Sequence, residues 1–405
     1  MESRKRPSFS KVPKRVKWTI YFTVFDAIGI GYLFTIIPAY LPELGFSSGE
    51  VGLILAAFSL ATMLCAIPLG LMSDRIGRKK VLIFGLSLFP VLLIAYAVTI
   101  DLALLIIFTM VGGVAEAAFM TAWNALIADQ TTLENRNSAF ALSFIINGSF
   151  TGLGFALPLF FPFIESATGW SSASVHQGTF VILALLCIIP PIAMYFVNRD
   201  YHEKRGASSE KRKGGRLAKS RANLIKFSLT NLLIGLGAGF IISLIPTWLF
   251  LKFGVTDSFS GPLLAISSIT MAFASFASAR LAFRYGSVKA IVLTQGISTI
   301  FLVMIPFMMG PIWAGAVYIV RSMFMNMSGP IQDSFLMSII DKEERGLASA
   351  INNIIWRLPN SVTTIFGGML LAAGFFDLPF FITAACYVMG IGIFFVLFRK
   401  VQPME

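Results

Sequence analysis

The sequence predicts an all-α membrane protein in which twelve transmembrane helices form two six-helix bundles. Three observations carry this prediction. The chain of 405 residues is 56% hydrophobic and only 13% charged, whereas soluble domains carry about 25% charged residues. Apolar runs long enough to cross a bilayer recur along the whole chain. Nearly all Lys and Arg residues fall in alternate connections between these runs, as expected when the connections alternate between two sides of a membrane.

Each predicted helix is a run of about 20 or more mainly apolar residues, the length that a helix needs to cross the hydrocarbon core. Strands are excluded because the runs are far longer than barrel strands and lack their alternation of polar and apolar residues. In the first half the runs are 18–42, 51–72, 80–100, 102–128, 138–162 and 178–197. In the second half they are 227–251, 261–282, 289–310, 312–340, 347–374 and 379–398.

The positive charges predict the orientation of the chain. Twelve spans place 29 of the 32 Lys and Arg residues on one side. Because cytoplasmic loops are enriched in Lys and Arg, we expect both termini in the cytoplasm and the protein in the cell membrane. The basic, polar segment 198–226 is expected to be a cytoplasmic linker. It would join an N-terminal bundle, residues 1–197, to a C-terminal bundle, residues 227–405.

Several classes of function are excluded by the composition. The net charge of +12 does not indicate nucleic-acid binding, because the cations lie where the membrane topology requires them. Cys65, Cys187 and Cys386 all lie in apolar runs and lack the spacing of metal ligands or of a disulfide framework. The sequence contains no nucleotide-binding Gly-Lys signature and no catalytic triad. We therefore expect no enzyme, no cofactor and no metal, and coupling to an ion gradient rather than to ATP.

The two halves of the chain repeat each other at a nearly constant offset. Three pairs of motifs match: Gly29-x-Gly31 with Gly237-x-Gly239, Arg75-x-Gly77 with Arg284-x-Gly286, and Glu134-x-Arg136 with Glu343-x-Arg345. Three such matches predict two equivalent bundles of the same orientation, related by an axis along the membrane normal. Transporters use parallel repeats of this kind. The repeat therefore predicts a cavity between the bundles that opens to one side of the membrane at a time.

The connection between the second and third runs reads Gly70-x-x-x-Asp74-Arg75-x-Gly77-Arg78-Lys79. It resembles the loop 2–3 signature of the major facilitator superfamily almost residue for residue. The resemblance implies a solute transporter that works by alternating access. The first helix resembles the drug-exporter branch of the same family, in Gly29, Gly31, Pro38, Tyr40, Leu41, Glu43, Gly45, Glu50 and Gly52.

Two stretches depart from the pattern of drug antiporters. The family's motif in the fourth helix begins with an Arg, and the matching stretch Phe108–Gly113 contains none. The glycine motif of the fifth helix is only partly present, in Gly148, Gly152, Gly154 and Pro158.

The signature loop is expected to form a cytoplasmic gate. Gly70 lets another helix approach closely, and the resemblance implies that this neighbour is the eleventh helix. Arg78 can reach Asp129 at the cytoplasmic end of the fourth helix. Such contacts would exist only while the cytoplasmic side is closed; alternatively, the cations only fix the sidedness of the loop. The gate candidates are Gly70, Asp74, Arg75, Gly77, Arg78, Asp129, Arg136 and Asp333.

Five ionisable residues lie within the predicted spans: Asp26, Glu116, Arg321, Asp333 and Arg357. Each costs about 2.5–3.5 kcal/mol near the bilayer centre if it faces lipid, so we expect them to face a cavity or to pair with one another. Because a carboxyl group removed from water can carry a proton, Asp26 and Glu116 are candidates for proton coupling. Alternatively, they are structural partners of the arginines. Arg321 and Arg357 are either anion-binding residues or counter-ions.

The candidates for the substrate cavity lie on the same helix faces as these charges. Met325 shares a face with Arg321, and methionine suits a tolerant site because it is flexible and polarizable. The candidates are Arg321, Arg357, Trp123, Asn124, Met325, Ser328, Gln332 and Asn353.

The sequence predicts a monomeric, proton-coupled secondary transporter that exports amphipathic or hydrophobic small molecules. Its partners would be the substrate, protons and the lipid bilayer. A second interpretation is a proton symporter that imports a small organic anion or a sugar, since two arginines lie within the spans. An apolar cavity would also suit a lipid flippase or a membrane receptor that transports nothing.

Overall fold

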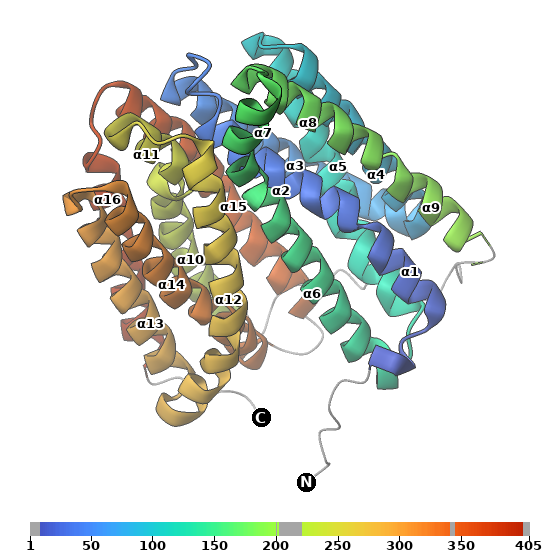
Figure 1. The fold of residues 1–405 in the computed structure, drawn as a ribbon. Helices are drawn as coiled ribbons and strands as arrows, with labels where there is room; N and C mark the ends of the chain where they lie inside the picture. The colour runs from blue at the N-terminus through green and yellow to red at the C-terminus, as the bar shows by residue number, and fades with distance from the viewer. Residues whose placement is uncertain (1–8, 200, 202–220, 341–344, 400–405) are drawn as a thin grey trace. The chain divides into compact units, whose positions relative to one another are not determined.

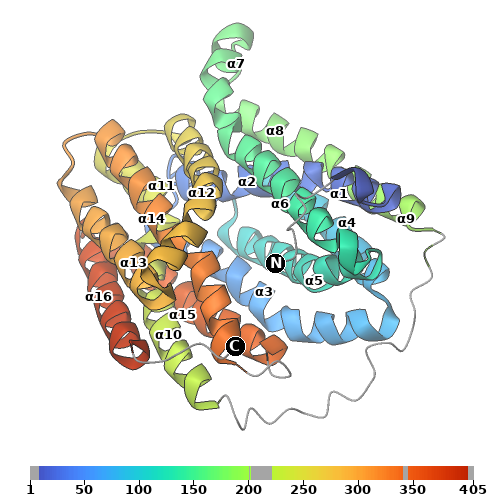
Figure 2. The ribbon, with the colours of Figure 1, turned by 90° about the horizontal axis from the view of Figure 1, so that it is seen from below.

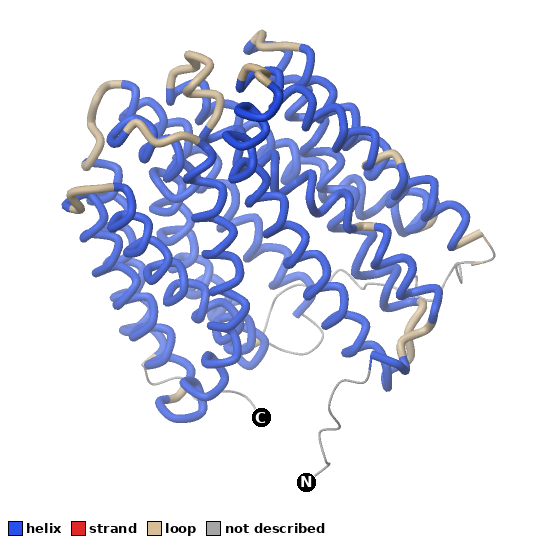
Figure 3. Tube along the Cα trace, in the orientation of Figure 1, coloured by secondary structure: helices blue, strands red, loops and turns tan. Residues whose placement is uncertain are grey.

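The structure is a computed structural model that describes residues 9–199, 201, 221–340 and 345–399. In these ranges every regular element is a helix (Figure 3). The helices of the first half are α1 Lys14–Phe22, α2 Val24–Ala39, α3 Ser48–Ile76, α4 Arg78–Val98, α5 Leu102–Asp129, α6 Leu133–Ala156, α7 Phe161–Thr168, α8 Ser172–Leu186 and α9 Ile189–Val197. Those of the second half are α10 Arg221–Ile241, α11 Ile245–Phe253, α12 Asp257–Tyr285, α13 Ser287–Met304, α14 Pro311–Ile339, α15 Arg345–Ala372 and α16 Leu378–Phe398.

Nine stretches of the described residues, each one helix or consecutive helices, are long and apolar enough to cross a membrane. Three further long helices, α12, α14 and α15, coincide with the remaining predicted runs. Helices α14 and α15 contain several Ser, Asn or Arg residues, which lower their mean hydropathy. In α12 the side chains of residues 271–276 lie outside the described part of the structure. The all-helical prediction is therefore confirmed, whereas the count of twelve spans stays a prediction.

Several predicted runs are interrupted within the membrane. The first run is α1 and α2, with a break at Thr23. The sixth is α8 and α9, with a break at Cys187 and Ile188, just before Pro190. The seventh is α10 and α11, and α11 has Pro246 in its first turn. Two of these breaks precede a proline, which lacks the amide hydrogen that would continue the helix.

The chain divides into two compact units, which are described one at a time. Unit 1 comprises Met1–Ile36 and Ala57–Glu210, and unit 2 comprises Ile37–Ala56 and Lys211–Glu405. Helices α2 and α3 therefore contribute to both units. Most of the expected linker lies outside the described residues, which omit residues 200 and 202–220. The expected boundaries of the two bundles stay a prediction.

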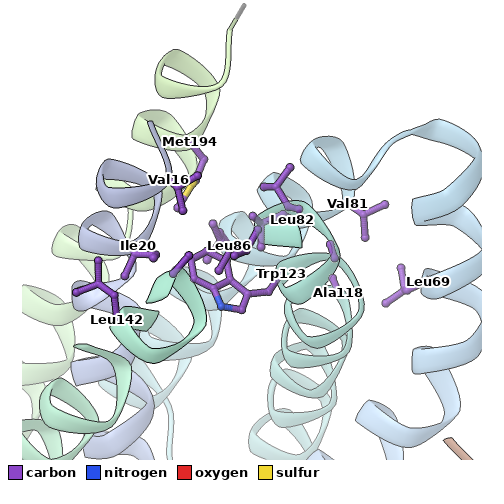
Figure 4. Close-up of a cluster of buried hydrophobic side chains, with 14 of the residues drawn as sticks. Val16, Ile20, Leu69, Val81, Leu82, Leu86, Ala118, Trp123, Leu142 and Met194 are labelled. Carbon is purple, nitrogen blue, oxygen red and sulfur yellow. The ribbon is translucent and has the colours of Figure 1, made fainter. Parts of the chain in front are cut away.

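In unit 1, α4 packs against α5, α8 and α9 (Figure 1). A cluster of buried side chains fills the space near the beginning of α4 and the end of α5. It contains Val16, Leu82, Leu86, Trp123 and Met194 (Figure 4). In unit 2, α10 packs against α15 and α16, and α13 packs against α14 and α16 (Figure 2). The core of that unit is aromatic, with Phe227, Phe335, Phe394 and Phe398.

The internal repeat extends to individual helix crossings. In unit 1, a Cβ atom added to Gly31 of α2 would collide with the carbonyl oxygen of Thr151 on α6. In unit 2, a Cβ atom added to Gly239 of α10 would collide with the carbonyl oxygen of Asn360 on α15. These four residues match one another at the repeat offset. Both units therefore need a glycine at this crossing, where two backbones touch.

The neighbouring contact of the same crossing is made with different chemistry in the two units. In unit 1, Gly154 of α6 packs directly on the carbonyl oxygen of Ile28. At the matching place in unit 2, the hydroxyl of Thr363 donates a hydrogen bond to the carbonyl oxygen of Leu236, at 2.8 Å. The two units thus share the geometry of this helix crossing. The residue that contacts the opposite backbone differs, being Gly154 in unit 1 and Thr363 in unit 2.

The two signature loops also match in backbone conformation. Gly77, between α3 and α4, has φ +109°, and Gly286, between α12 and α13, has φ +77°. The amide of Gly77 donates to the carbonyl oxygen of Ser73 at 3.1 Å, and that of Gly286 to Ala282 at 2.9 Å. Since positive φ is costly for residues with a side chain, the fold requires glycine in both loops.

Candidate functional site

The expected contact between Arg78 and Asp129 is present in unit 1. The guanidinium of Arg78, the first residue of α4, forms an ion pair with the carboxylate of Asp129, the last residue of α5. Arg78 also donates from Nη1 to the carbonyl oxygen of Ala125, at 3.1 Å. This second bond orients the guanidinium along the end of α5. The prediction of this contact is confirmed, and its role in a gate stays a prediction.

The other gate candidates lie on α3, in the loop that follows α3, on α6 and on α14 of the second half of the chain. Arg75, at the end of α3, is exposed, and so is Asp333 of α14. Asp74 lies in α3 and Arg136 in α6, but their side chains lie outside the described part of the structure. Unit 1 itself has room for a side chain at Gly70. An added Cβ atom would lie 3.8 Å from Thr121 Cγ2, an ordinary van der Waals contact.

Asp26 lies beside two interrupted helices of unit 1; the residue as a whole is half-buried, and its carboxylate oxygens are buried. It lies in the first turn of α2, three residues after the break at Thr23. The thiol of Cys187, at the break between α8 and α9, donates to the carbonyl oxygen of the adjacent Phe25, at 3.4 Å. Both carboxylate oxygens of Asp26 are inaccessible, and neither has a hydrogen-bond partner among the described residues.

The fold itself does not require a carboxylate at this position. The repeat places Ile234 of unit 2 where unit 1 has Asp26, and Ile234 is a buried core residue. A buried acid without a hydrogen bond is destabilising. Of the two matching helices, only α2 carries a carboxylate at this position.

The candidates on α5 occupy different surroundings. Glu116 is half-buried. Trp123 belongs to the buried cluster of unit 1 (Figure 4), where it stacks on Phe119 and donates from Nε1 to the hydroxyl of Ser143, at 3.0 Å. Asn124, the next residue, is exposed. The structure thus brings Trp123 into a packed core and leaves Asn124 at a surface of the unit.

Arg321 is a buried cation held by neutral groups. Its side chain on α14 is 3% exposed. Nη2 donates to the hydroxyl of Tyr387 on α16 at 3.0 Å, and the guanidinium lies 5.8 Å from the centre of that ring. Its Nε has no hydrogen-bond partner in the described structure.

Other polar side chains continue this cluster across unit 2. The hydroxyl of Ser267 on α12 donates to Ser322 Oγ at 2.9 Å. The amide of Gln295 on α13 donates to Ser328 Oγ at 3.2 Å. Ser328 in turn donates to the carbonyl oxygen of Met325, at 2.7 Å. Ser298 of α13 donates to the carbonyl oxygen of Arg321, at 2.9 Å. The candidate Ser328 therefore lies in a polar layer along α13 and α14 that also contains Arg321, and Met325 contributes only its backbone carbonyl oxygen to it.

Among the described residues, the serine pair has no polar counterpart at the matching crossing of unit 1. The repeat offset pairs Ser267 with Phe58 and Ser322 with Gly113. A Cβ atom added to Gly113 would collide with the carbonyl oxygen of Phe58. The same two helices are thus joined by a serine pair in unit 2 and by direct backbone packing in unit 1. A comparison of the two halves at this offset would have shown the polar layer from the sequence.

The candidates on α15 lie apart from this layer. Arg357 is half-buried, and its carbonyl oxygen accepts a hydrogen bond from the hydroxyl of Ser361, at 2.9 Å. Asn352 accepts a hydrogen bond from Asn231 of α10, at 2.6 Å. The side chain of Asn353 lies outside the described residues. Gln332, one turn beyond Ser328 on α14, is half-buried.

Unit 2 contains one contact region that the sequence did not indicate, the segment Ile37–Ala56. The hydroxyl of Thr247 on α11 donates to the carbonyl oxygen of Pro38. The amide of Asp257, the first residue of α12, donates to Glu43 Oε1 at 3.1 Å. A carboxylate at a helix N-terminus is favoured by the helix dipole. The end of α2 and the connection between α2 and α3 are therefore tied to α11 and α12 by specific hydrogen bonds.

The long apolar helices, the parallel repeat and the buried ionisable groups define a multi-pass membrane protein. The sequence matches the model of the Major Facilitator Superfamily over residues 20–364, and again over residues 228–404. The chain belongs to this superfamily. The second match begins inside the first, in keeping with the internal repeat.

Curated relatives match a part of the chain. The quinolone resistance protein NorA of Staphylococcus aureus (strain MRSA252) is 32% identical over 135 residues, which cover 33% of this chain and 35% of NorA. Multidrug resistance protein 2 of Bacillus subtilis (strain 168) is 30% identical over 145 residues, which cover 33% of this chain and 36% of that protein. The chain thus spans about a third of the length of these relatives.

Solved structures show the same fold over nearly the whole chain. The crystal structure of a bacterial homologue of the human lysosomal transporter Spinster, in an inward-facing and unoccupied conformation, has a TM-score of 0.76 at 16% identity. That match covers 98% of both chains. A point mutant of the nucleoside transporter NupG has a TM-score of 0.74 at 14% identity, covering 95% of this chain and 99% of NupG. At such identities the likeness concerns the fold alone.

Proposed function

We propose that the protein is a proton-coupled secondary transporter that exports amphipathic or hydrophobic small molecules from the cell by alternating access. Membership of the superfamily supports transport, and the names of the bacterial relatives support drug-like substrates. The observation that carries the proposal is the pair of buried carboxylate oxygens of Asp26, which have no hydrogen-bond partner among the described residues.

The surroundings of Asp26 suit a group that exchanges a proton. An ionised carboxylate at this place has lost its hydrating water without gaining a hydrogen bond. The resulting desolvation free energy disfavours the charged form of Asp26 relative to the protonated form. The helix breaks at Thr23 and Cys187 lie beside it. Interrupted helices can shift locally and give water access in one state. Asp26 is therefore the first candidate for the coupling proton, and Glu116 is the second.

The signature loop would control the cytoplasmic side. We assign the ion pair of Arg78 and Asp129, together with Gly70 and Asp74, to the outward-open state, in which this side is closed. Contacts that form in one state typically shift a conformational equilibrium by about 1–3 kcal/mol. Asp74→Asn is then expected to abolish transport while expression and membrane insertion stay intact. Normal transport by this variant would leave the loop with only a topological role.

The substrate would enter a cavity lined by apolar and weakly polar side chains. Ser328 is the candidate that lies in the polar layer of unit 2, and Met325, Arg357 and Gln332 are further candidates. The proposed protein is a monomer of the cell membrane with both termini in the cytoplasm. It would need protons, substrate and lipid, and no cofactor.

A second candidate function is supported by Arg321, whose Nε has no hydrogen-bond partner in the described structure. A desolvated guanidinium with a spare donor is suited to bind a carboxylate or phosphate. A proton symporter that imports a small organic anion would use it in this way. If Arg321→Ala leaves the binding of every tested organic anion unchanged, this second function is excluded.

The test of the first function is transport in proteoliposomes under an imposed pH gradient. The substrates would be a fluorescent amphipathic cation, a quinolone, a sugar and a dicarboxylate. We expect uphill movement of the first two only, driven by the gradient. Asp26→Asn should remove this dependence, whereas Asp26→Glu should keep part of it. Proton coupling is wrong if transport ignores the gradient and both Asp26→Asn and Glu116→Gln match the wild type.

A further inference from the structure

Unit 1 contains an apolar groove that has no part in the function proposed above. It has a volume of about 840 Å³ and lies between α4 and the interrupted pair α8 and α9. Its walls include Ile83, Val91 and Ile94 of α4 and Ile188 and Ile192 of the opposite side. The groove is open along one side, where large apolar side chains are exposed; Val91, for example, is 45% exposed. In a membrane, this open side faces hydrocarbon.

The groove has the dimensions of a lipid chain. Its lining runs from Ile83 to Val98 along α4, which corresponds to about 22 Å of helix. This is most of the hydrocarbon thickness of about 30 Å. The hydroxyl of Ser87, a polar side chain of the lining, donates to the carbonyl oxygen of Ile83 at 2.8 Å. The hydroxyl hydrogen is thus used within α4, and the wall presents an apolar surface to its occupant.

One end of the groove is basic. Tyr195 lines the groove, and Lys79 Nζ lies 5.2 Å from the centre of its ring. The same ammonium group donates to the carbonyl oxygen of Asn198, at 2.7 Å. Lys80 follows Lys79 in the sequence, and Arg199 follows Asn198. The side chains of Lys80 and Arg199 are both exposed. Lys79 therefore lies at the end of the groove that the positive charges assign to the cytoplasm, and these two exposed cations are next in sequence to Lys79 and to its partner Asn198.

The membrane topology alone does not explain this arrangement. The repeat places Val288 of unit 2 where unit 1 has Lys79, so the matching loop functions without a cation at this position. Arg78, the neighbouring cation, is already paired with Asp129. Lys79 instead joins α4 to the end of α9, at the mouth of the groove.

We propose that this groove binds an anionic glycerophospholipid of the cytoplasmic leaflet. One acyl chain would lie between α4 and α9, and the phosphate would lie at Lys79, Lys80 and Arg199. An apolar groove open to the bilayer accepts any acyl chain, whereas the three cations select a negative headgroup. The bound lipid would tie α4 to α9 and would thereby stabilise unit 1. This inference is independent of the substrate and direction of transport.

The test is native mass spectrometry of the purified full-length protein, with phosphatidylglycerol and phosphatidylcholine of identical acyl chains. We expect the wild type to retain phosphatidylglycerol in preference to phosphatidylcholine. Lys80→Gln and Arg199→Gln should each weaken the binding of phosphatidylglycerol by about fivefold, as for other basic residues near an anionic membrane surface. Neither substitution should change the binding of phosphatidylcholine.

Filling the groove provides a second test. Ser87→Trp places an indole in the groove and should abolish the retention of phosphatidylglycerol. If this variant does not fold, Val91→Trp is used in its place, because Val91 also lines the groove. Thr270→Trp on α12 is the matched control, because Thr270 is half-buried and its hydroxyl, like that of Ser87, donates to the carbonyl oxygen four residues earlier. Equal binding of both lipids by the wild type would overturn the proposal. Unchanged retention by the groove-filling variants would overturn it as well.

Discussion

Arg78 and Asp129 form an ion pair that joins the first residue of α4 to the last residue of α5. Both side chains are partly accessible, at 20% and 37%. Ion pairs in such positions contribute about 0–1 kcal/mol to stability. The pair is therefore poorly placed to hold the unit together, and well placed to act in a contact that forms and breaks during transport.

Neutralising this pair should affect transport more than stability. We expect Asp129→Asn to lower the rate of substrate export about tenfold, by a change of about 1.4 kcal/mol, with the melting temperature nearly unchanged. Export by proteoliposomes and thermal unfolding in detergent measure the two quantities. The charge-swapped double variant Arg78→Asp, Asp129→Arg should recover part of the activity. A large loss of stability with no change in export would show that the pair is only structural.

The glycines of the two signature loops should be equally intolerant of substitution. Because Gly77 and Gly286 both have positive φ, we expect an alanine at either position to destabilise the protein by about 1–2 kcal/mol. Gly296, inside α13 with no atom near an added Cβ, provides the control. Since alanine favours the helix more than glycine does, Gly296→Ala should raise the melting temperature slightly. A neutral effect at Gly77 would contradict the loop conformation.

The crossing of α2 and α6 gives a third prediction. A Cβ atom at Gly154 would collide with the backbone of α2, so Gly154→Ala should force the helices apart and lower the yield of folded protein. Gly148→Ala on the same helix should have little effect, because an added Cβ there meets no atom within 4 Å. Size-exclusion chromatography of both variants compares them directly. Similar profiles would show that α6 does not pack on α2 as described.

Tyr387 should matter because it partners a buried charge. We expect Tyr387→Phe to destabilise the protein by about 1–3 kcal/mol, since the lost hydroxyl leaves Arg321 Nη2 without this partner. Adding Arg321→Met should restore much of the stability, because replacing a buried charge by an apolar group of similar volume is often neutral or favourable. Thermal unfolding of the single and double variants measures the coupling. Additive effects would show that the two side chains do not interact.

Much of the fold was predictable because the physical signals are local. An apolar run of about 20 residues has few alternatives to a spanning helix, and every predicted run contains a helix in the structure. The contact of Arg78 with Asp129 was also predictable, since both residues lie at helix ends that short connections bring to the same side. The matching positive φ of Gly77 and Gly286 follows from the repeat.

The interior of the helical units was less predictable because it depends on which faces meet. Hydropathy does not distinguish a straight span from one that breaks, so the break at Thr23 beside Asp26 could not be found in this way. The tyrosine that holds Arg321 lies 66 residues further along the chain, at position 387. Trp123 shares a helix face with Glu116, yet it packs into the core, because Ser143 and Phe119 hold its ring.

We propose that Asp26 carries the proton that drives export. The most direct measurement is proton movement during substrate export, recorded with a pH-sensitive dye inside proteoliposomes that contain the wild type or Asp26→Asn. We predict that the wild type moves protons against substrate, and that Asp26→Asn binds substrate with similar affinity but moves no protons. Full proton-coupled export by Asp26→Asn would contradict the account.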